Sequence, residues 1–215
     1  MLQLWRGAAI AAACMLCASV SSAGDFHFTG SLTTDDQLEQ FMFSLSSPGT
    51  VTAITYGYAG GTNVASQVIP AGGFDPWLAI FDSSGNLLAS VDNGTCGQVG
   101  TDPSTGACFD SFISQSFASG TYTLILSESD NQPVDTTLAD GYTRTGQGNF
   151  TGGEFGCSNG SFCDANGDNR TANFAVDILA GGDGGGGVPE PATIVLGAAG
   201  LAGIIGLRRW RAAVQ

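Results

Sequence analysis

The sequence contains no lysine and only one histidine, His27, among its 215 residues. A chain without lysine cannot form a Schiff base or a Ser-Lys catalytic dyad. A phosphate-binding loop and the His/Glu spacing of a zinc enzyme are missing as well. These absences predict a protein that is not an enzyme. Because a glycoside hydrolase needs only two carboxylates, a secreted glycosidase is kept as an alternative.

Basic residues are scarce. All six are arginines, against 19 acidic residues, and the formal net charge is -13. Arg144 and Arg170 are the two arginines that lie away from the chain ends. An acidic surface of this kind repels the phosphate backbone of nucleic acids and anionic lipid headgroups. We therefore expect no nucleic-acid partner, and we expect an attraction for divalent cations.

Residues 1–23 have the pattern of a secretory signal peptide. Arg6 precedes an apolar stretch, and the segment ends in the small residues 21–23. Two of the cysteines, Cys14 and Cys17, lie inside this segment. We predict that the segment directs export and is removed, so that the mature chain folds in an oxidising compartment.

Residues 192–207 form an uncharged apolar run, and Arg208, Arg209 and Arg211 follow it. A helix of that length, at about 1.5 Å per residue, reaches about 24 Å, a little less than the hydrocarbon core of about 30 Å. We predict a transmembrane helix over 192–207. The arginine cluster is the membrane stop, and the positive-inside rule leaves the preceding chain outside the cytoplasm. From the residues alone, this tail could also be a plain C-terminal anchor.

The tail over 188–215 resembles the PEP-CTERM sorting signal of Gram-negative bacteria. The resemblance rests on Pro189, Glu190 and Pro191, followed in order by the apolar run and the arginine cluster. It implies that an exosortase, a membrane cysteine protease, recognises the tripeptide, removes the helix and passes the protein outward. The precursor would be tethered to the inner membrane, and the mature form would lie at the cell surface or in the extracellular matrix. The family also implies a link to exopolysaccharide and biofilm.

Residues 24–180 are predicted to form one all-β domain, and the glycine-rich segment 181–187 is predicted to be a flexible linker. Apolar and polar residues alternate with a period of two, which indicates strands with one buried face. Short strands, glycine-rich turns and no amphipathic helix favour an antiparallel β-sandwich. The alternation is clear at 26–28, 41–45, 122–124 and 174–178.

Three segments of this domain depart from the strand pattern. Residues 35–39 could form a short helix, although the stretch is too short to change the fold class. Residues 60–73 and 131–149 are predicted to be loops, and the second of them is polar, contains Arg144 and has no periodicity.

The middle of the chain resembles the bacterial prepeptidase C-terminal domain, a jelly-roll sandwich often appended to secreted proteases. The resemblance rests on an apolar strand pair, 74–81 and 87–89, joined by the turn from Asp82 to Gly85. A later strand opened by Gly120, Thr121 and Tyr122 adds to it. It implies a jelly-roll-like antiparallel β-sandwich.

Four cysteines remain after the signal peptide, and they allow three pairings. We predict disulfides between sequence neighbours, Cys96 with Cys108 and Cys157 with Cys163, because each pair would close a loop. The alternative is a four-cysteine zinc site. Neither pair has the spacing that such sites favour, and export disfavours a zinc site too.

The turn that contains Asp164, Asn166 and Asp168 is a candidate calcium site. Oxygen side chains at relative positions 1, 3 and 5 can converge on one hard cation. The pattern departs from an EF-hand, because Ala175 stands where a bidentate glutamate is required. The alternative is a solvated turn. Three further aspartates could form a second site, namely Asp75, Asp92 and Asp110.

Tyr56, Tyr58 and Trp77 could form an aromatic platform for sugar rings, although core packing explains the same residues. Together these features predict a non-enzymatic secreted protein of the cell surface or extracellular matrix. The exopolysaccharide partner comes from the PEP-CTERM resemblance. The alternative function is a carbohydrate-binding module of the cell surface.

Overall fold

The computed structural model describes residues 24–180. The predicted signal peptide, the linker, the sorting tripeptide, the apolar run over 192–207 and the arginine cluster lie outside the described residues. Within the described range, none of the helices is long and apolar enough to cross a membrane.

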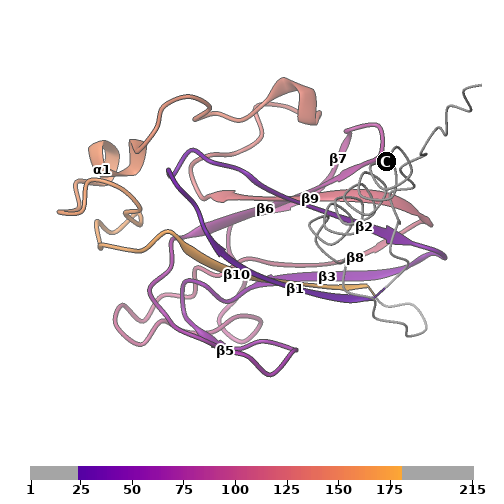
Figure 1. Cartoon of the computed structure of the whole chain (residues 1–215), viewed down its shortest axis with the longest axis horizontal. Coiled ribbons are helices and arrows are strands. Elements are labelled where there is room, and N and C mark those ends of the chain that lie inside the picture. Colours follow the sequence, from indigo (N-terminus) through magenta and orange to yellow (C-terminus); the bar gives the residue numbers. More distant parts are fainter. Residues whose placement is uncertain (1–23, 181–215) are drawn as a thin grey trace, which may run out of the picture.

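Two antiparallel sheets of four strands each form the described chain (Figure 1). One sheet has the order β1-β10-β3-β8 and the other the order β2-β9-β6-β7, and β4 and β5 form a separate hairpin. The all-β antiparallel sandwich predicted from the sequence is therefore confirmed. The strands are β1 (Asp25–Ser31), β2 (Glu39–Leu45), β3 (Gly49–Thr55), β4 (Gly61–Thr62), β5 (Val68–Ile69), β6 (Pro76–Asp82), β7 (Leu87–Val91), β8 (Phe112–Phe117), β9 (Gly120–Glu128) and β10 (Asn173–Ala180).

The core lies between the two sheets. It is built from the apolar positions of the alternating pattern, such as Phe26, Val51, Leu78, Leu124 and Val176, all of which are buried. Each side chain of this size contributes about 1.5–3 kcal/mol when it is fully removed from water. Alternation thus places the apolar residues of strands distant in sequence on the same inner face.

The outer face of β6 is covered as well. Ala79 and Phe81 pack there against Ile125 of β9 and against Tyr142. Tyr142 belongs to the segment 131–149, which is a loop as predicted, apart from one turn of 3-10 helix, η1 (Leu138–Asp140). The loop therefore covers part of the outer face of this sheet.

The stretch 35–39 is a turn that leads into β2 at Glu39, and not a helix. A short helix forms elsewhere, α1 (Phe150–Phe155). The two segments are in contact, because the buried carboxylate of Asp35 accepts the backbone N–H groups of Phe150 and Thr151 at 2.8 and 3.0 Å. The side chain of Asp35 thus binds the first turn of α1, where unpaired N–H groups need acceptors.

Candidate functional site

The four cysteines of the domain form two disulfides, Cys96 with Cys108 and Cys157 with Cys163. This is the neighbour pairing predicted from the sequence, and it excludes the alternative in which the four thiolates bind zinc. Each bridge closes a loop outside the sheets. Because a cross-link of this kind restricts the unfolded chain, both bridges stabilise loops that have little apolar core of their own.

The predicted calcium turn is closed by its own first residue. Asp164 is fully buried, and its Oδ1 accepts the backbone N–H groups of Asn166 and Asp168, both at 3.0 Å. Its Oδ2 accepts the hydroxyl of Tyr58 at 2.7 Å. The side chains of Asn166 and Asp168 are exposed. Asp164 therefore organises the turn and ties it to Tyr58.

Within residues 24–180, no group of three or more His, Cys, Asp or Glu side chains is placed to hold a metal ion. The calcium site at Asp164, Asn166 and Asp168 therefore stays a prediction. A calcium ion at this turn would take part of its ligands from Asn166, from backbone carbonyls or from water, all of which calcium accepts.

Arg170, two residues beyond this turn, is a buried cation that the sequence did not single out. Its Nη2 donates to Oδ2 of Asp102 at 3.0 Å and to the carbonyl of Tyr58 at 2.9 Å, and its Nε donates to the carbonyl of Gly73 at 3.0 Å. The guanidinium lies 3.6 Å from the ring centroid of Tyr58. Arg170 therefore joins the turn that precedes β10 to two other loops.

Asp102, the partner of Arg170, lies inside the loop closed by Cys96 and Cys108. Burial acts to raise its pKa, but hydrogen bonds from Ser104, Thr105 and Arg170 outweigh burial and hold the pKa well below its usual range. Asp102 is therefore a carboxylate that fixes the disulfide loop to the sandwich.

Three carboxylates lie where strands of one sheet end, and two of them, Asp75 and Glu128, are buried, whereas Asp92 is half-buried. Asp75 directly precedes β6, Asp92 directly follows β7 and Glu128 ends β9, which pairs with β6. One carboxylate oxygen of Asp75 and one of Asp92 are buried and have no hydrogen-bond partner within the described chain. Of the three aspartates proposed as a second calcium site, Asp75 and Asp92 thus reach the same end of the sheet.

Asp110, the third aspartate of that predicted site, is engaged elsewhere. Its Oδ1 accepts the hydroxyl of Thr55 at 2.8 Å and the N–H of Tyr58 at 3.1 Å, and its Oδ2 accepts the N–H of Ala59 at 2.8 Å. It supports the backbone after β3, and both of its oxygens already accept hydrogen bonds there.

The carboxylates at the strand ends hold protons more firmly than ordinary side chains. Burial, and after it the nearby charges of Asp92 and Glu128, raise the pKa of Asp75 from 3.8 to about 9. Burial and the charge of Asp130 raise the pKa of Asp92 to about 6. Burial also raises the pKa of Glu128 well above its usual range. This end of the sandwich therefore disfavours negative charge.

The aromatic platform predicted as one alternative does not form. Tyr58 is fully buried beneath Arg170, and Trp77 is half-buried against the cluster on the outer face of β6. The interpretation as packing residues is correct for both side chains. A sugar could therefore not stack on Tyr58.

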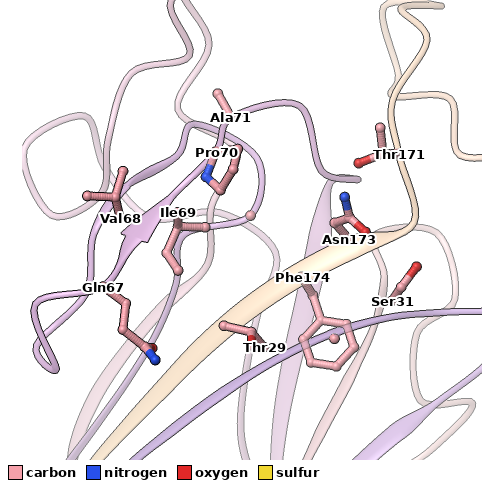
Figure 2. Close-up of a pocket in the computed structure, with 12 residues that line it drawn as sticks. Thr29, Ser31, Gln67, Val68, Ile69, Pro70, Ala71, Thr171, Asn173 and Phe174 are labelled. Atoms are coloured by element: carbon pink, nitrogen blue, oxygen red, sulfur yellow. The ribbon is translucent and has the colours of Figure 1, made fainter.

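A groove of about 610 Å³ lies between the β4–β5 hairpin and the β1–β10 pair (Figure 2). The hairpin is held there by Asp177 of β10, whose Oδ2 accepts the N–H of Val64 at 2.9 Å. The other carboxylate oxygen of Asp177 lies 2.8 Å from Nδ1 of His27. The only histidine of the sequence therefore lies beside the carboxylate that anchors the hairpin.

The segment 60–73, predicted to be a loop, contains the short strands β4 and β5, so this groove was not predicted. The signal in the sequence that could have indicated it is the apolar run from Val68 to Ala71, directly after the polar residue Gln67.

Residues 187–211 match the PEP-CTERM protein-sorting motif. The resemblance seen in the tail is thereby confirmed, and the match includes Pro189, Glu190 and Pro191. No curated protein matches the chain. Among solved structures, the pre-peptidase C-terminal domain of collagenase from Bacillus anthracis is 9% identical, with a TM-score of 0.35, over 74% of this chain and 90% of that chain. The PEP-CTERM signal implies a secreted protein that is anchored in the membrane before an exosortase processes it.

Proposed function

We propose that the mature protein is a non-enzymatic component of the cell surface or extracellular matrix, associated with exopolysaccharide. The observation that carries this proposal is the PEP-CTERM motif at 187–211. The motif supplies the export route, in which the apolar run over 192–207 tethers the precursor to the inner membrane until an exosortase cuts the chain. The sandwich domain is then the part that acts outside the cell.

The architecture supports a structural role for this domain. Two of the buried carboxylates are engaged in holding loops, since Asp35 holds α1 and Asp102 holds Arg170. His27 contacts Asp177, which anchors the β4–β5 hairpin. Disulfides and buried polar contacts thus stabilise the loops of the sandwich.

The processing step is tested with Glu190→Ala in the full chain, expressed in the native host. If the tripeptide is the exosortase recognition element, wild type yields a form without the tail in the envelope or medium. The variant should stay full-length in the inner membrane. Asp183→Ala removes a carboxylate seven residues earlier, within the linker, and should be processed normally.

Two results would contradict this proposal. Finding only full-length wild-type protein in the inner membrane would favour the plain anchor. Processed protein that never cofractionates with exopolysaccharide would leave the export route intact but remove the proposed matrix association.

A further inference from the structure

The groove beside the β4–β5 hairpin has a lining without charge, in a chain whose net charge is -13. Of the described residues that form its walls, every one is a neutral polar residue, an apolar residue or a glycine. Figure 2 shows Gln67, Val68 and Ile69 on the hairpin side and Thr29 and Asn173 on the sheet side. A charged ligand would find no ionic partner here.

Several polar groups of the lining are available to a ligand. The hydroxyl of Thr29, the amide of Asn173 and the Nε2 of Gln67 form no hydrogen bond within the part of the chain that the structure describes, and all three residues are exposed. They offer both donors and acceptors, since a hydroxyl and a primary amide can do both. The groove can therefore recognise a ligand that carries several hydroxyl groups.

The same groove has an apolar wall. Val68 is 81% exposed, which is unusual for a valine, and Ile69 and Pro70 continue its surface. The ring of Phe174 reaches the lining beneath Gly30, where a Cβ would lie only 2.5 Å from the ring Cζ. Glycine at position 30 thus leaves room for the Phe174 ring below the β1 backbone. Val68, Ile69 and Pro70 can pack against the C–H faces of a ligand, and the buried Phe174 ring supports the floor of the groove.

We propose that this groove binds a short segment of a neutral polysaccharide. A sugar ring combines hydroxyl groups with apolar C–H faces, and the lining offers partners for both. The volume falls within the range of about 300–1,000 Å³ that is usual for small-ligand sites. This inference rests on the proposed association with exopolysaccharide and identifies the surface and the class of glycan that would carry it.

The test uses the exported protein purified from the host, together with the host exopolysaccharide separated by anion exchange into neutral and acidic fractions. Binding to each fraction is measured by affinity electrophoresis. Wild type should bind the neutral fraction, and periodate oxidation of the sugar diols should abolish binding. Asn173→Ala and Thr29→Val should each weaken binding about tenfold, the equivalent of about 1.4 kcal/mol.

Gln115→Ala is the matched control. Gln115 is an exposed amide on β8, at the opposite edge of the same sheet, and its side chain forms no hydrogen bond within residues 24–180. This variant should bind like wild type. Melting temperatures within about a degree of wild type would show that Asn173→Ala and Thr29→Val fold normally, since both replace exposed side chains.

Three outcomes would overturn the proposal: binding confined to the acidic fraction, binding that survives periodate, or equal binding by wild type and both groove variants. If wild type cofractionates with exopolysaccharide but the groove variants do so too, the groove assignment fails and the proposed function stands. If the protein never leaves the inner membrane, the proposed function fails, whereas the same binding measurement on protein extracted from that membrane still decides the groove.

Discussion

Replacing Asp75 with asparagine is expected to stabilise the folded domain at neutral pH. Asp75 is 3% exposed, and one of its carboxylate oxygens is buried without a hydrogen-bond partner within the described chain. Its pKa is about 9 in the folded domain and 3.8 in an unfolded chain. Between these values the folded state binds a proton that the unfolded state has released.

The sign and size of the effect follow from proton linkage. The contribution of Asp75 to stability is fully present below pH 3.8 and is lost as pH rises through about 9. Each pH unit in that window removes about 1.4 kcal/mol, so that about 4 kcal/mol is lost by pH 7. A carboxamide of the same shape does not titrate. Asp75→Asn should therefore remove most of this loss.

The assay is urea unfolding, followed by circular dichroism, at several pH values from 4 to 8.5. The stability difference between Asp75→Asn and wild type should grow steadily with pH. Asp82→Asn is the control at the other end of β6. Hydrogen bonds from Asn86 and Ser84 outweigh burial there and lower the pKa of the Asp82 carboxyl, so its replacement should destabilise the domain at neutral pH. Parallel pH profiles for wild type and Asp75→Asn would refute the reasoning.

Two further predictions concern the loops. Arg170→Met should destabilise the domain by about 3–5 kcal/mol in urea unfolding, because Asp102 would be left as a buried charge without its partner; a loss below about 1 kcal/mol would show that the pair contributes little. Calcium at a hundred times its dissociation constant should stabilise wild type by about 2.7 kcal/mol in thermal unfolding, and Asp168→Ala should lose this effect. An equal response to magnesium, or an unchanged response in Asp168→Ala, would leave Asp164 to Asp168 as a solvated turn.

The sandwich could be predicted because the alternation of residues within each strand indicates which of its faces is buried. Phe41 and Phe43 alternate with Gln40, Met42 and Ser44, and this period of two places both rings on the inner face of β2. The cysteines allowed three pairings, and the preference for partners that are neighbours in sequence predicted the two disulfides that form. Features that depend on contacts far apart in sequence were not accessible. Asp35 starts a helix at residue 150, and no local pattern near either segment shows that contact.

In the candidate sites, too, the local turn could be predicted from the sequence, whereas the contacts with distant residues could not. Asp164, Asn166 and Asp168 were correctly placed in a turn, but the buried hydroxyl of Tyr58 that takes one oxygen of Asp164 comes from 106 positions away. Arg170 follows that turn in the sequence, where its neighbours do not indicate that it is buried. Only the fold shows that Asp102 and the carbonyl of Gly73 surround its guanidinium.

The contacts around Arg170 also connect folding with export. Asp102 lies inside the loop closed by Cys96 and Cys108, and Arg170 follows soon after the bridge from Cys157 to Cys163. Disulfides form in oxidising compartments and are rare in the cytosol. Before export, both loops would be open, and the buried ion pair would have to form without the cross-links that hold Asp102 in place. The loop end of the sandwich should therefore reach its full stability only after the chain has left the cytoplasm.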